Sequence, residues 1–512
     1  MNQPPLLPSS PRAGGNVVQL KATDGTPVEF VDNMIGQGGM KDVYFAPDKS
    51  YVVAFFRDAQ NFDSRERLKS VVGAFRERIY LQPGGEYWKN VFCWPYNMIE
   101  YKGRLGIVAP TYQKHFFFQY GSKNGDMLGI KGKEKEGKWF STGTHQQKYL
   151  DDRERGNWRD YISVCAKIAR GVKRLHAAGL AHSDLSYKNV LIDPVGRNAA
   201  IIDIDGLVVP GKFPPDVVGT PDFIAPEVMA TLKLSLQDKN RSLPRIETDR
   251  HALAVLIYMY LLYRHPLKGG IVHPASSEEE RLALEMGAKA LFVEHPADTR
   301  NRPNLRDVKK SELPYADVGK LPYTITGPYL TALFDRAFIH GLHQPSARPT
   351  ANDWEDALVR TVDLMQPCAN SSCTHRWYVF DNTTTPKCPF CGTVYTGLLP
   401  VLNLYSNRGN GSFRPDNHRV MVYSNQYLYL WHASRLIFPN ERLTDEQKIP
   451  VGYFSFHNGR WIFINQRLPG LKDMTTNRQI PINSALELSD GQEILLSPEE
   501  GGRLVQVQMI RA

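Results

Sequence analysis

Four cysteines that lie close together in the sequence form a specific metal-binding pattern. They come as two pairs separated by fourteen residues: Cys368, Cys373, Cys388 and Cys391. Two pairs of thiolates can close a tetrahedral zinc site, and the second pair, CPFC, is followed by a glycine suited to a tight turn. The first pair is more widely spaced, so His375 could replace Cys373 as a ligand. We predict a structural Zn²⁺ site with no open position for catalysis; the alternative is a set of buried free thiols.

Glycines, carboxylates and an amide recur in four short segments further upstream. IGQGGMKDVY (35–44) lies between strand-like runs, and its glycines would let the backbone approach the phosphates of a nucleotide. HSDLSYKN (182–189) follows a predicted helix, and IIDIDG (201–206) and GTPDFIAPE (219–227) come after it. In this order and spacing the segments resemble the signature set of protein kinases. The resemblance implies a bilobal protein-kinase fold that transfers the γ-phosphate of MgATP to a hydroxyl of a protein substrate.

The resemblance implies roles for individual residues. Asp184 would accept the proton of the attacking hydroxyl, and Asn189 and Asp203 would hold Mg²⁺ or Mn²⁺. The nucleotide would lie against the glycine-rich segment, at Gly36, Gly38, Gly39 and Val43. The hinge that binds adenine should follow the strand RLGIVAP, with Tyr112 as backbone donor because Pro110 has no N–H. Structural residues of the family are matched by Asp249, Glu227 and Arg348.

The chain departs from the kinase pattern at the lysine that binds the α- and β-phosphates. The third strand reads VVAFF, with Phe56 at the lysine position, and Lys41 stands where the third glycine of the loop is expected. The with-no-lysine kinases make the same exchange, so the resemblance implies that Lys41 binds the phosphates. A first-lobe glutamate should pair with Lys41, and Glu77 fits better than Glu66 by its distance from the third strand. The alternative is a solvated lysine above an inactive site, as in a pseudokinase.

Further departures concern regulation and specificity. Ser183 replaces the arginine that normally binds an activation-loop phosphate, and the segment between Gly206 and Gly219 contains no Ser, Thr or Tyr. We therefore predict that phosphorylation of this loop does not activate the protein. Ser186 replaces the lysine typical of serine/threonine kinases, while Lys188 lies at the offset of the tyrosine-kinase arginine and could serve the γ-phosphate. The segment GTPDFIAPE favours serine/threonine specificity over tyrosine specificity.

Composition limits the class of protein. The chain has 512 residues, a formal net charge of +9, 42% hydrophobic residues and 11% aromatic residues, which is enough for buried cores and excludes global disorder. No apolar run approaches the ~20 residues of a membrane-spanning helix, and the first residues do not resemble a secretory signal. The charge excess is too modest to indicate nucleic acid. We predict a cytoplasmic, multidomain α+β protein with neither a membrane nor a nucleic acid as partner.

The order of hydrophobic patterns and breakers divides the chain into modules. We predict a disordered leader at 1–16 and a kinase domain at 17–365, with an N-lobe at 17–112 and a C-lobe at 113–365. A charged insert at 120–157 is expected to be a solvated loop, with a docking surface for an acidic partner as the alternative. A zinc ribbon at 366–397 and an all-β sandwich at 398–512 complete the chain.

The sandwich carries a second resemblance. VGYFSFHNGRWIFIN and ALELSDGQEILL look like the later strands of a forkhead-associated domain. Such domains read phosphothreonine, but Ser434 and Arg435 are not followed by the expected histidine, and no Gly-Arg motif precedes them. We expect a forkhead-associated-like sandwich that binds a partner protein rather than a working phosphothreonine reader.

The kinase, zinc and β modules together resemble bacterial stress-signalling kinases linked to tellurite resistance. These kinases are encoded beside a TerY-type von Willebrand factor A protein and a metal-dependent serine/threonine phosphatase, and the resemblance implies those two proteins as partners. It rests on GQGGMKDVY, HSDLSYKNVL, IIDIDGLVVP and VVGTPDFIAPE and on the module order. The alternative function is a pseudokinase scaffold that recruits partners through its zinc and β modules.

Overall fold

The computed structural model describes residues 16–37, 40–209, 219–235, 238–381, 385–409 and 411–511. The chain divides into two compact units. The first comprises Met1–Gly156, Ser163–Tyr323 and Leu333–Glu355, and the second comprises Asn157–Ile162, Thr324–Ala332 and Asp356–Ala512. Except for Asn16, the predicted leader lies outside the described residues.

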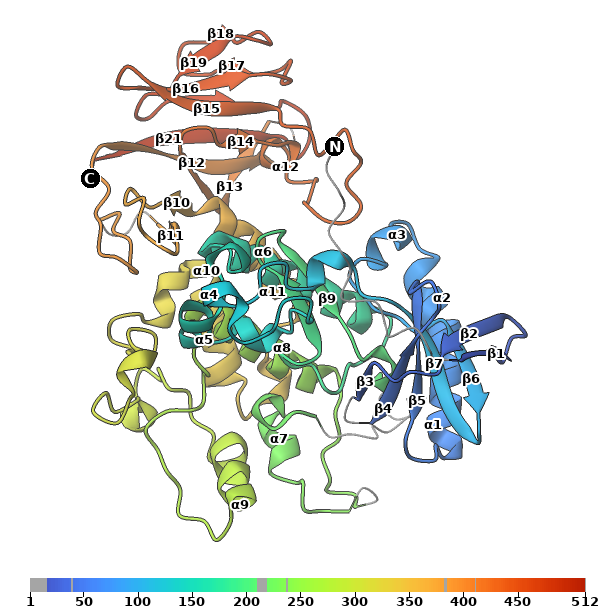
Figure 1. Cartoon of the computed structure of the whole chain (residues 1–512). Helices are drawn as coiled ribbons and strands as arrows, with labels where there is room; N and C mark the ends of the chain where they lie inside the picture. Colours follow the sequence, from blue (N-terminus) through green and yellow to red (C-terminus); the bar gives the residue numbers. More distant parts are fainter. Residues whose placement is uncertain are drawn as a thin grey trace. The chain divides into compact units, whose positions relative to one another are not determined.

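An antiparallel sheet forms the N-terminal part of the first unit, with five strands in the order β3-β4-β5-β7-β6 (Figure 1). Its strands are β3 (Gly36–Gln37), β4 (Lys41–Phe45), β5 (Tyr51–Phe56), β6 (Asn97–Tyr101) and β7 (Arg104–Pro110). A separate hairpin pairs β1 (Val17–Lys21) with β2 (Pro27–Val31). Successive side chains of β5 enter different apolar clusters, Val53 and Phe55 one cluster, Ala54 and Phe56 another. This alternation is what a strand buried on both faces requires.

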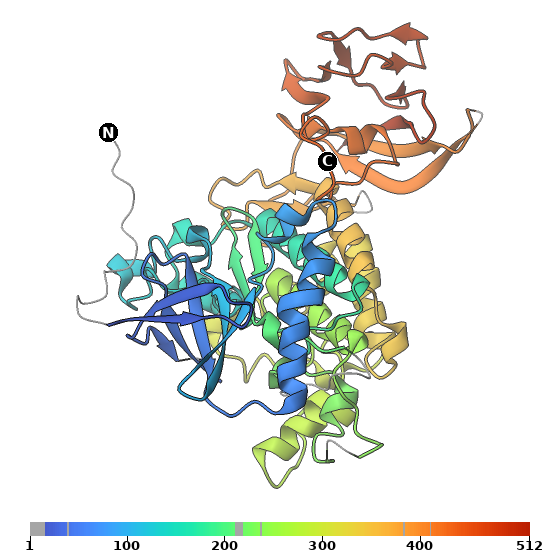
Figure 2. The same cartoon turned by 90° about the vertical axis from the view of Figure 1, so that its right-hand side faces the viewer.

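One helical stretch packs on the second of these clusters. It runs through α1 (Phe62–Ser70), a π-helical turn (Val71–Phe75) and α2 (Arg76–Tyr80), beside the sheet in Figure 2. Asn61 caps α1 by accepting a hydrogen bond from the backbone N–H of Ser64 at 2.8 Å. Leu68 of α1 is buried among the side chains of the sheet. A short helix, α3 (Gly85–Trp88), follows before β6.

The rest of the first unit is mainly helical. Its described α-helices are α4 (Lys123–Asp126), α5 (Gly143–Tyr149), α6 (Trp158–Ala177), α7 (Pro226–Met229), α8 (Ile246–Leu262), α9 (Glu278–Ala283), α10 (Pro328–Asp335) and α11 (Ala351–Asp363). A short hairpin pairs β8 (Val190–Asp193) with β9 (Asn198–Ile201). Some residues of α6, α10 and α11 belong to the second unit. The apolar run predicted to be a buried helix is α8, and from Thr248 to Leu262 almost all its side chains are buried. Among the described residues, no helix has both the length and the apolarity needed to cross a membrane.

The charged insert at 120–157 differs from the expected solvated loop. It contains short helices and buries Ile130, Phe140 and Leu150. Lys135, in the same insert, is 6% exposed and contacts Glu154 at 2.9 Å and Asp193 at 3.0 Å. A run of charges is compatible with burial when opposite charges far apart in sequence meet, and sequence spacing does not reveal that pairing.

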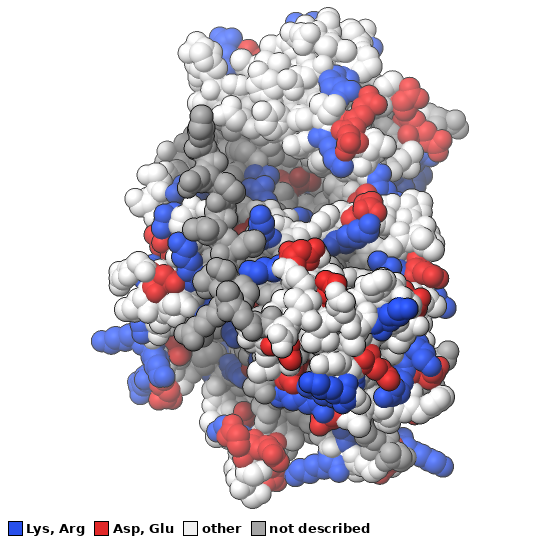
Figure 3. Space-filling model, turned by 45° about the vertical axis from the view of Figure 1, so that its right-hand side comes forward, with Lys and Arg blue, Asp and Glu red and all other residues white. Residues whose placement is uncertain are grey.

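Positive and negative side chains are mixed on the surface, as the modest net charge of +9 leads one to expect. On the face shown in Figure 3, Lys and Arg are interspersed with Asp and Glu. Such mixing keeps the local field weak, because neighbouring charges of opposite sign offset each other and salt screens the remainder beyond about 8–10 Å.

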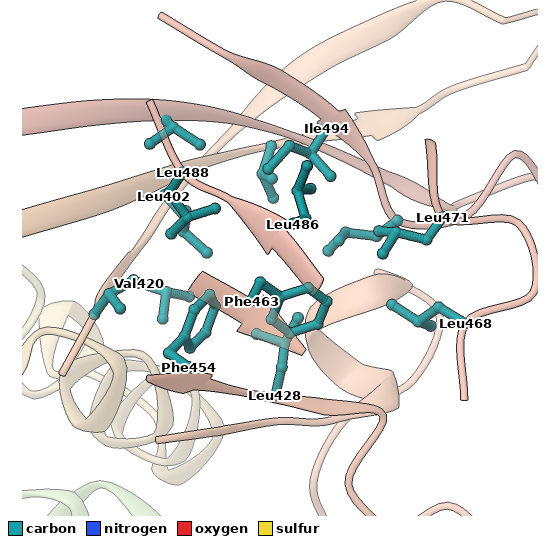
Figure 4. Packing of buried hydrophobic residues seen from close by; sticks show 14 of the residues in the cluster. Leu402, Val420, Leu428, Phe454, Phe463, Leu468, Leu471, Leu486, Leu488 and Ile494 are labelled. Atoms are coloured by element: carbon teal, nitrogen blue, oxygen red, sulfur yellow. The ribbon is translucent and has the colours of Figure 1, made fainter. Parts of the chain in front are cut away.

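Two antiparallel sheets form the larger part of the described residues of the second unit (Figure 1). The six-stranded sheet has the order β13-β12-β21-β20-β17-β18 and the four-stranded sheet the order β14-β15-β16-β19. The described strands of these sheets and the short helix between them are β12 (Leu398–Asn407), β13 (Phe413–Met421), β14 (Tyr427–Leu428), α12 (Leu430–Ala433), β15 (Gly452–His457), β16 (Arg460–Asn465), β17 (Lys472–Asp473), β18 (Arg478–Gln479), β19 (Ala485–Glu487), β20 (Glu493–Leu495) and β21 (Arg503–Arg511). Apolar residues of both sheets form one buried cluster, which includes Leu402, Val420, Phe454, Phe463 and Ile494 (Figure 4). Two sheets that share a core in this way are held together by alternate inward-facing residues of each strand.

A buried carboxylate between two histidines links α11 to this region of antiparallel sheet. Asp363, the last residue of α11, contacts His418 Nε2 at 2.7 Å and His432 Nε2 at 3.2 Å. His432 Nδ1 accepts a hydrogen bond from the N–H of Tyr429 at 3.0 Å, so Nε2 carries the proton that Asp363 accepts. Burial alone would raise the pKa of Asp363, but the two histidines hold it below its ordinary value. Burial lowers the pKa of His418.

Replacing Asp363 by Asn should destabilise the second unit by about 1–3 kcal/mol, because an amide donor would face a histidine donor in a buried site. Asp445→Asn, a change of the same chemistry at a fully exposed carboxylate (101%), is the control and should be neutral. Urea unfolding of both variants at pH 7 measures the difference; equal midpoints would contradict a stabilising role.

The stability of the second unit should fall as the pH is lowered. Because the folded pKa of Asp363 is depressed, its contribution is present above the unfolded value of about 3.9 and is lost as the pH falls through the folded pKa. His418 also has a depressed folded pKa, so stability declines as the pH falls below about 6.5. Both effects make the wild-type unit weaker in acid.

Candidate active site

The carboxylate of Asp184 is held by hydrogen bonds at both oxygens. Asn189 Nδ2 donates to Asp184 Oδ2 at 2.9 Å and to its backbone carbonyl at 2.8 Å. Thr220 donates to Asp184 Oδ1 through its backbone N–H at 2.6 Å and its hydroxyl at 2.9 Å. Asp184 also borders a hollow lined by Gly219, Thr220 and Phe223. The hollow is small, about 10 Å³. An oriented carboxylate can accept a proton from a hydroxyl that is brought against it.

The loop that carries Asp184 is anchored to the buried helix α8. Asp249 of α8 accepts hydrogen bonds from the backbone N–H groups of His182 and Ser183, at 2.7 and 3.1 Å. Ser183 has a φ of 68°, a strained conformation for a residue with a side chain. Such strain persists where surrounding contacts determine the backbone, as the Asp249 hydrogen bonds do here.

A second anchor fixes the segment after Thr220. Arg348 is 1% exposed and donates to both carboxylate oxygens of Glu227, at 2.9 and 2.7 Å. A bidentate pair of this type is directional, so it fixes the end of the segment as well as neutralising charge. The pairing of these residues, 121 positions apart, is the one that the sequence implies.

Lys41 reaches the same region from the sheet. On β4 it lies directly opposite Phe56 of β5, and its Nζ is 5.5 Å from the centroid of the Phe56 ring. Nζ is 2.8 Å from Asp203 Oδ1. Asp203 follows the β8-β9 hairpin in a left-handed conformation, with a φ of 61°. Residues 162 positions apart are thus brought together as a cation beside a carboxylate.

The carboxylate of Asp205 completes this group and was not assigned a role from the sequence. Lys41 Nζ is 2.7 Å from each of its oxygens. The side chain of Asp205 is only 9% exposed, whereas that of Asp203 is 47% exposed. The signal was available in IIDIDG, where a second acidic residue follows two positions after Asp203. The sequence does not show that the side chain of Asp205 points toward Lys41, because that direction depends on the turn Ile204–Gly206.

The electrostatics of the group keep Lys41 charged. Burial alone would lower the pKa of Lys41, but the charges of Asp205 and Asp203 outweigh burial and raise it above its ordinary value. Lys41 in turn lowers the pKa of Asp203. Burial raises the pKa of Asp205, against the opposing charge of Lys41. A permanently charged ammonium next to an accessible carboxylate suits a site for phosphates and a divalent cation.

Glu77 is not brought to Lys41. It lies on α2 with its side chain exposed. The alternative, Glu66, forms an ion pair with Lys69 at 2.6 Å on the surface of α1. Spacing along the chain does not fix which way such a glutamate points, since a shift of one position rotates a helical side chain by about 100°.

Residues expected around a nucleotide lie near this group. Gly36 pairs with Val43 across β3 and β4, and Val43 packs on the cluster that contains Ala54. A Cβ at Gly36 would meet open space. Tyr112, just after β7, packs with Leu191 of β8. Gly38 and Gly39 lie outside the described residues.

Two positions bear on the identity of the acceptor. The Thr220 hydroxyl lies 3.2 Å from Ser186 Oγ, so Ser186 joins the group around Asp184. Lys188 is exposed, and its backbone N–H donates to Ser186 Oγ at 3.3 Å. The structure therefore ties Ser186 to Asp184 through Thr220 and leaves the ammonium of Lys188 at the surface.

The four cysteines form a separate cluster in the second unit. Their sulfur atoms all lie within 4.8 Å of one another. The Sγ atoms of Cys368 and Cys391 are 3.5 Å apart, and those of Cys373 and Cys388 are 3.9 Å apart. A tetrahedral Zn²⁺ with Zn–S bonds of about 2.3 Å separates its sulfurs by about 3.8 Å. The donors present therefore fit a zinc ion.

Cys373 and His375, the two candidate ligands of the first pair, have different surroundings. Cys373 contributes its sulfur to the cluster. The ring of His375 instead stacks on Phe390, with centroids 3.8 Å apart. The strand β10 (Met365–Pro367) ends just before Cys368, and it pairs with β11 (Trp377–Val379), which lies between the two cysteine pairs.

Comparison with known proteins supports the assignment of the first unit. Residues 140–312 match the family model of the protein kinase domain. The matched range contains Asp184, Asn189 and Asp203, but it begins after Lys41.

Most of the similar proteins are serine/threonine kinases, and one is a dual serine/threonine and tyrosine protein kinase of Apis mellifera, 31% identical over 74 residues that cover 14% of this chain and 8% of that protein. The chain is 31% identical over 145 residues to serine/threonine-protein kinase PkaB of Streptomyces coelicolor, a range that covers 26% of this chain and 32% of PkaB. It is 30% identical over 189 residues to dkf-1 of Caenorhabditis elegans, with 33% and 25% covered, and 32% identical over 130 residues to serine/threonine-protein kinase H1 of Homo sapiens, with 22% and 28% covered. The similarity thus spans about a third or less of these relatives. The chain carries a protein kinase domain, and its similarity is to serine/threonine kinases.

Proposed function

We propose that this chain is an ATP-dependent serine/threonine protein kinase whose phosphate-binding lysine is Lys41 of β4. The observation that carries the proposal is the position of Lys41 Nζ, 2.8 Å from Asp203 and on the side of the sheet where Phe56 replaces the usual lysine. A cation is required there because negative charge must be held throughout the transfer. Lys41 supplies it from the neighbouring strand.

Each polar residue then has one task. Asp184 accepts the proton of the substrate hydroxyl, and its hydrogen bonds with Asn189 and Thr220 orient it. Asn189 and Asp203 are the residues that would hold Mg²⁺ or Mn²⁺, and the 47% exposure of Asp203 leaves its carboxylate accessible. When bound, the divalent cation neutralises charge on the phosphates of ATP. Gly36, Val43 and Tyr112 would contact the nucleotide, together with Gly38 and Gly39.

Serine/threonine specificity is supported by Thr220. Its hydroxyl bridges Asp184 and Ser186, at 2.9 and 3.2 Å. Thr220, part of the segment GTPDFIAPE that favours serine/threonine specificity, therefore stands beside the carboxylate that receives the proton. Lys188 remains the candidate for the γ-phosphate, since a long lysine side chain can reach inward from the surface.

Control by loop phosphorylation is not part of the proposal. The Ser183 hydroxyl, in place of the family's arginine, donates to the Gly206 carbonyl at 3.3 Å. It therefore holds the catalytic loop to the turn that carries Asp205. The loop whose composition lacks a phosphate acceptor falls largely at 210–218, outside the described residues.

The second unit is proposed to serve recruitment. The sulfur distances support a structural zinc ribbon at 366–397, and the two packed antiparallel sheets support a forkhead-associated-like sandwich. The TerY-type protein and the metal-dependent phosphatase remain proposed partners, on the resemblance of the whole chain. The kinase domain at 17–365 and the sandwich at 398–512 are retained as proposed modules.

Zinc content tests the second unit. The full chain should contain about one Zn²⁺, and Cys388→Ser should lower that content to near zero because three thiolates bind far more weakly than four. Cys388 is fully buried, so the thermal transition of the unit should also shift downward. Cys93→Ser, outside the cluster, is the matched control. Metal analysis that found no zinc in the wild type would leave buried thiols as the explanation.

A scaffold without transfer activity is the second candidate, because Phe56 stands at the lysine position and the family match begins after the first lobe. The deciding experiment is transfer of labelled phosphate from MgATP to the protein itself and to a generic basic protein substrate. Label on either is the expected result. A folded, zinc-loaded chain that transfers no label would support the scaffold, or an enzyme that needs its partners.

A further inference from the structure

We propose that Asp205, rather than a glutamate of the first-lobe helix, is the residue that positions Lys41 for the nucleotide. The inference rests on the proposed kinase function and adds a positioning residue to it. Lys41 Nζ contacts both oxygens of Asp205 at 2.7 Å and one oxygen of Asp203 at 2.8 Å. An ammonium has three protons, and these contacts account for all of its donor capacity.

The two carboxylates differ in their access to solvent. Asp205 is 9% exposed and lies inside the turn Ile204–Gly206, whereas Asp203 is 47% exposed. When a phosphate accepts a hydrogen bond from Lys41, the contact given up is therefore the one with the outer carboxylate, which is also the proposed metal ligand. Asp205 keeps both of its contacts with the ammonium and so fixes the direction of the Lys41 side chain.

The charged side chains of the first-lobe helical stretch support the assignment of Asp205. Glu77 is exposed on α2, while Arg67 of α1 is 4% exposed. The negative charge of Asp205 acts on Arg67. A buried cation on this helix would repel Lys41 unless a carboxylate stood between them. With Lys41 and Arg67 as cations and Asp203 and Asp205 as anions, the formal charge of the group is balanced.

Loss of Asp205 has a consequence that general unfolding would not produce. Lys41 would have Asp203 as its remaining carboxylate, and the ammonium would then compete with Mg²⁺ for that residue. Removal of the negative charge of Asp205 would at the same time strengthen the binding of the metal-free polyphosphate, because less negative charge would repel it. Metal dependence and metal-free binding should therefore change in opposite directions.

The test uses the full chain and a fluorescent ATP analogue, titrated with Mg²⁺ and with EDTA. In Asp205→Asn we expect unchanged or tighter binding without metal, an approximately tenfold higher Mg²⁺ requirement, and a kcat reduced about tenfold or more. Glu77→Gln, the matched loss of one carboxylate charge, should change none of these. Equal effects of the two variants, or a loss in Glu77→Gln alone, would overturn the proposal.

A double-mutant cycle shows whether Asp205 acts through Lys41. Lys41→Met with Asp205→Asn should be no worse in kcat than Lys41→Met alone, because the positioned group is already absent. Additive losses would overturn the proposal. Asp205→Gly, which introduces the residue that kinases usually carry here, should reproduce Asp205→Asn, and full activity in this variant would also overturn it. A wild-type chain that binds the analogue but transfers no phosphate contradicts the proposed function, while the binding shifts still decide the role of Asp205.

Discussion

Asp184→Asn is expected to lower the rate of phosphate transfer about 10²- to 10⁴-fold, the range that a positioned general base supplies. The asparagine has the same shape, so the fold and the nucleotide site should be preserved. Its amide cannot accept the proton of the substrate hydroxyl. One amide nitrogen would also face a donor, either Thr220 or Asn189, both of which donate to Asp184 in the wild type.

The measurement is single-turnover transfer of labelled phosphate, with nucleotide affinity measured separately. We expect the loss in kcat alone, with affinity for MgATP unchanged within about twofold. Asp298→Asn is the control, since Asp298 pairs with Arg300 on the surface at 2.6 Å and should be silent. A variant at Asp184 with wild-type kcat would show that another residue takes the proton.

Lys41→Met should lower kcat about 10²- to 10³-fold, as expected when one pre-organised donor to developing charge is removed. A second variant can show whether the ammonium must come from β4 or only has to lie at this position in space. Lys41 and Phe56 are direct cross-strand partners, and the Lys41 ammonium lies 5.5 Å from the centroid of the Phe56 ring. Side chains of directly opposed residues share one face of a sheet.

We therefore expect Phe56→Lys to restore about tenfold or more of the activity lost in Lys41→Met, by supplying the ammonium from the third strand. Rescue should be incomplete because Phe56 is buried at 6% exposure and its replacement disturbs the cluster with Leu68 and Met98. Phe56→Met on the same background is the control and should rescue nothing. If Lys41→Met alone kept full activity, the phosphate-binding lysine would have to lie elsewhere.

Much of the site could be predicted from sequence because the residues are local to short segments. Asp184 and Asn189 are five positions apart in one loop, so their hydrogen bond needs no long-range information. The four cysteines are similar, since their spacing already limits how their sulfurs can meet. The buried helix α8 followed from the length and apolarity of its run.

The partner of Lys41 was decided by tertiary structure alone. Glu77 had a suitable distance along the chain, but a π-helical turn at Val71–Phe75 interrupts the helical stretch and Glu77 is exposed. The insert at 120–157 is a second example, because the burial of Lys135 depends on Asp193, 58 residues away. Sequence determined which groups the chain possesses and their order; the packing of distant segments determined which charges share a buried space, because electrostatic pairing depends on distance in space and on burial rather than on separation along the chain.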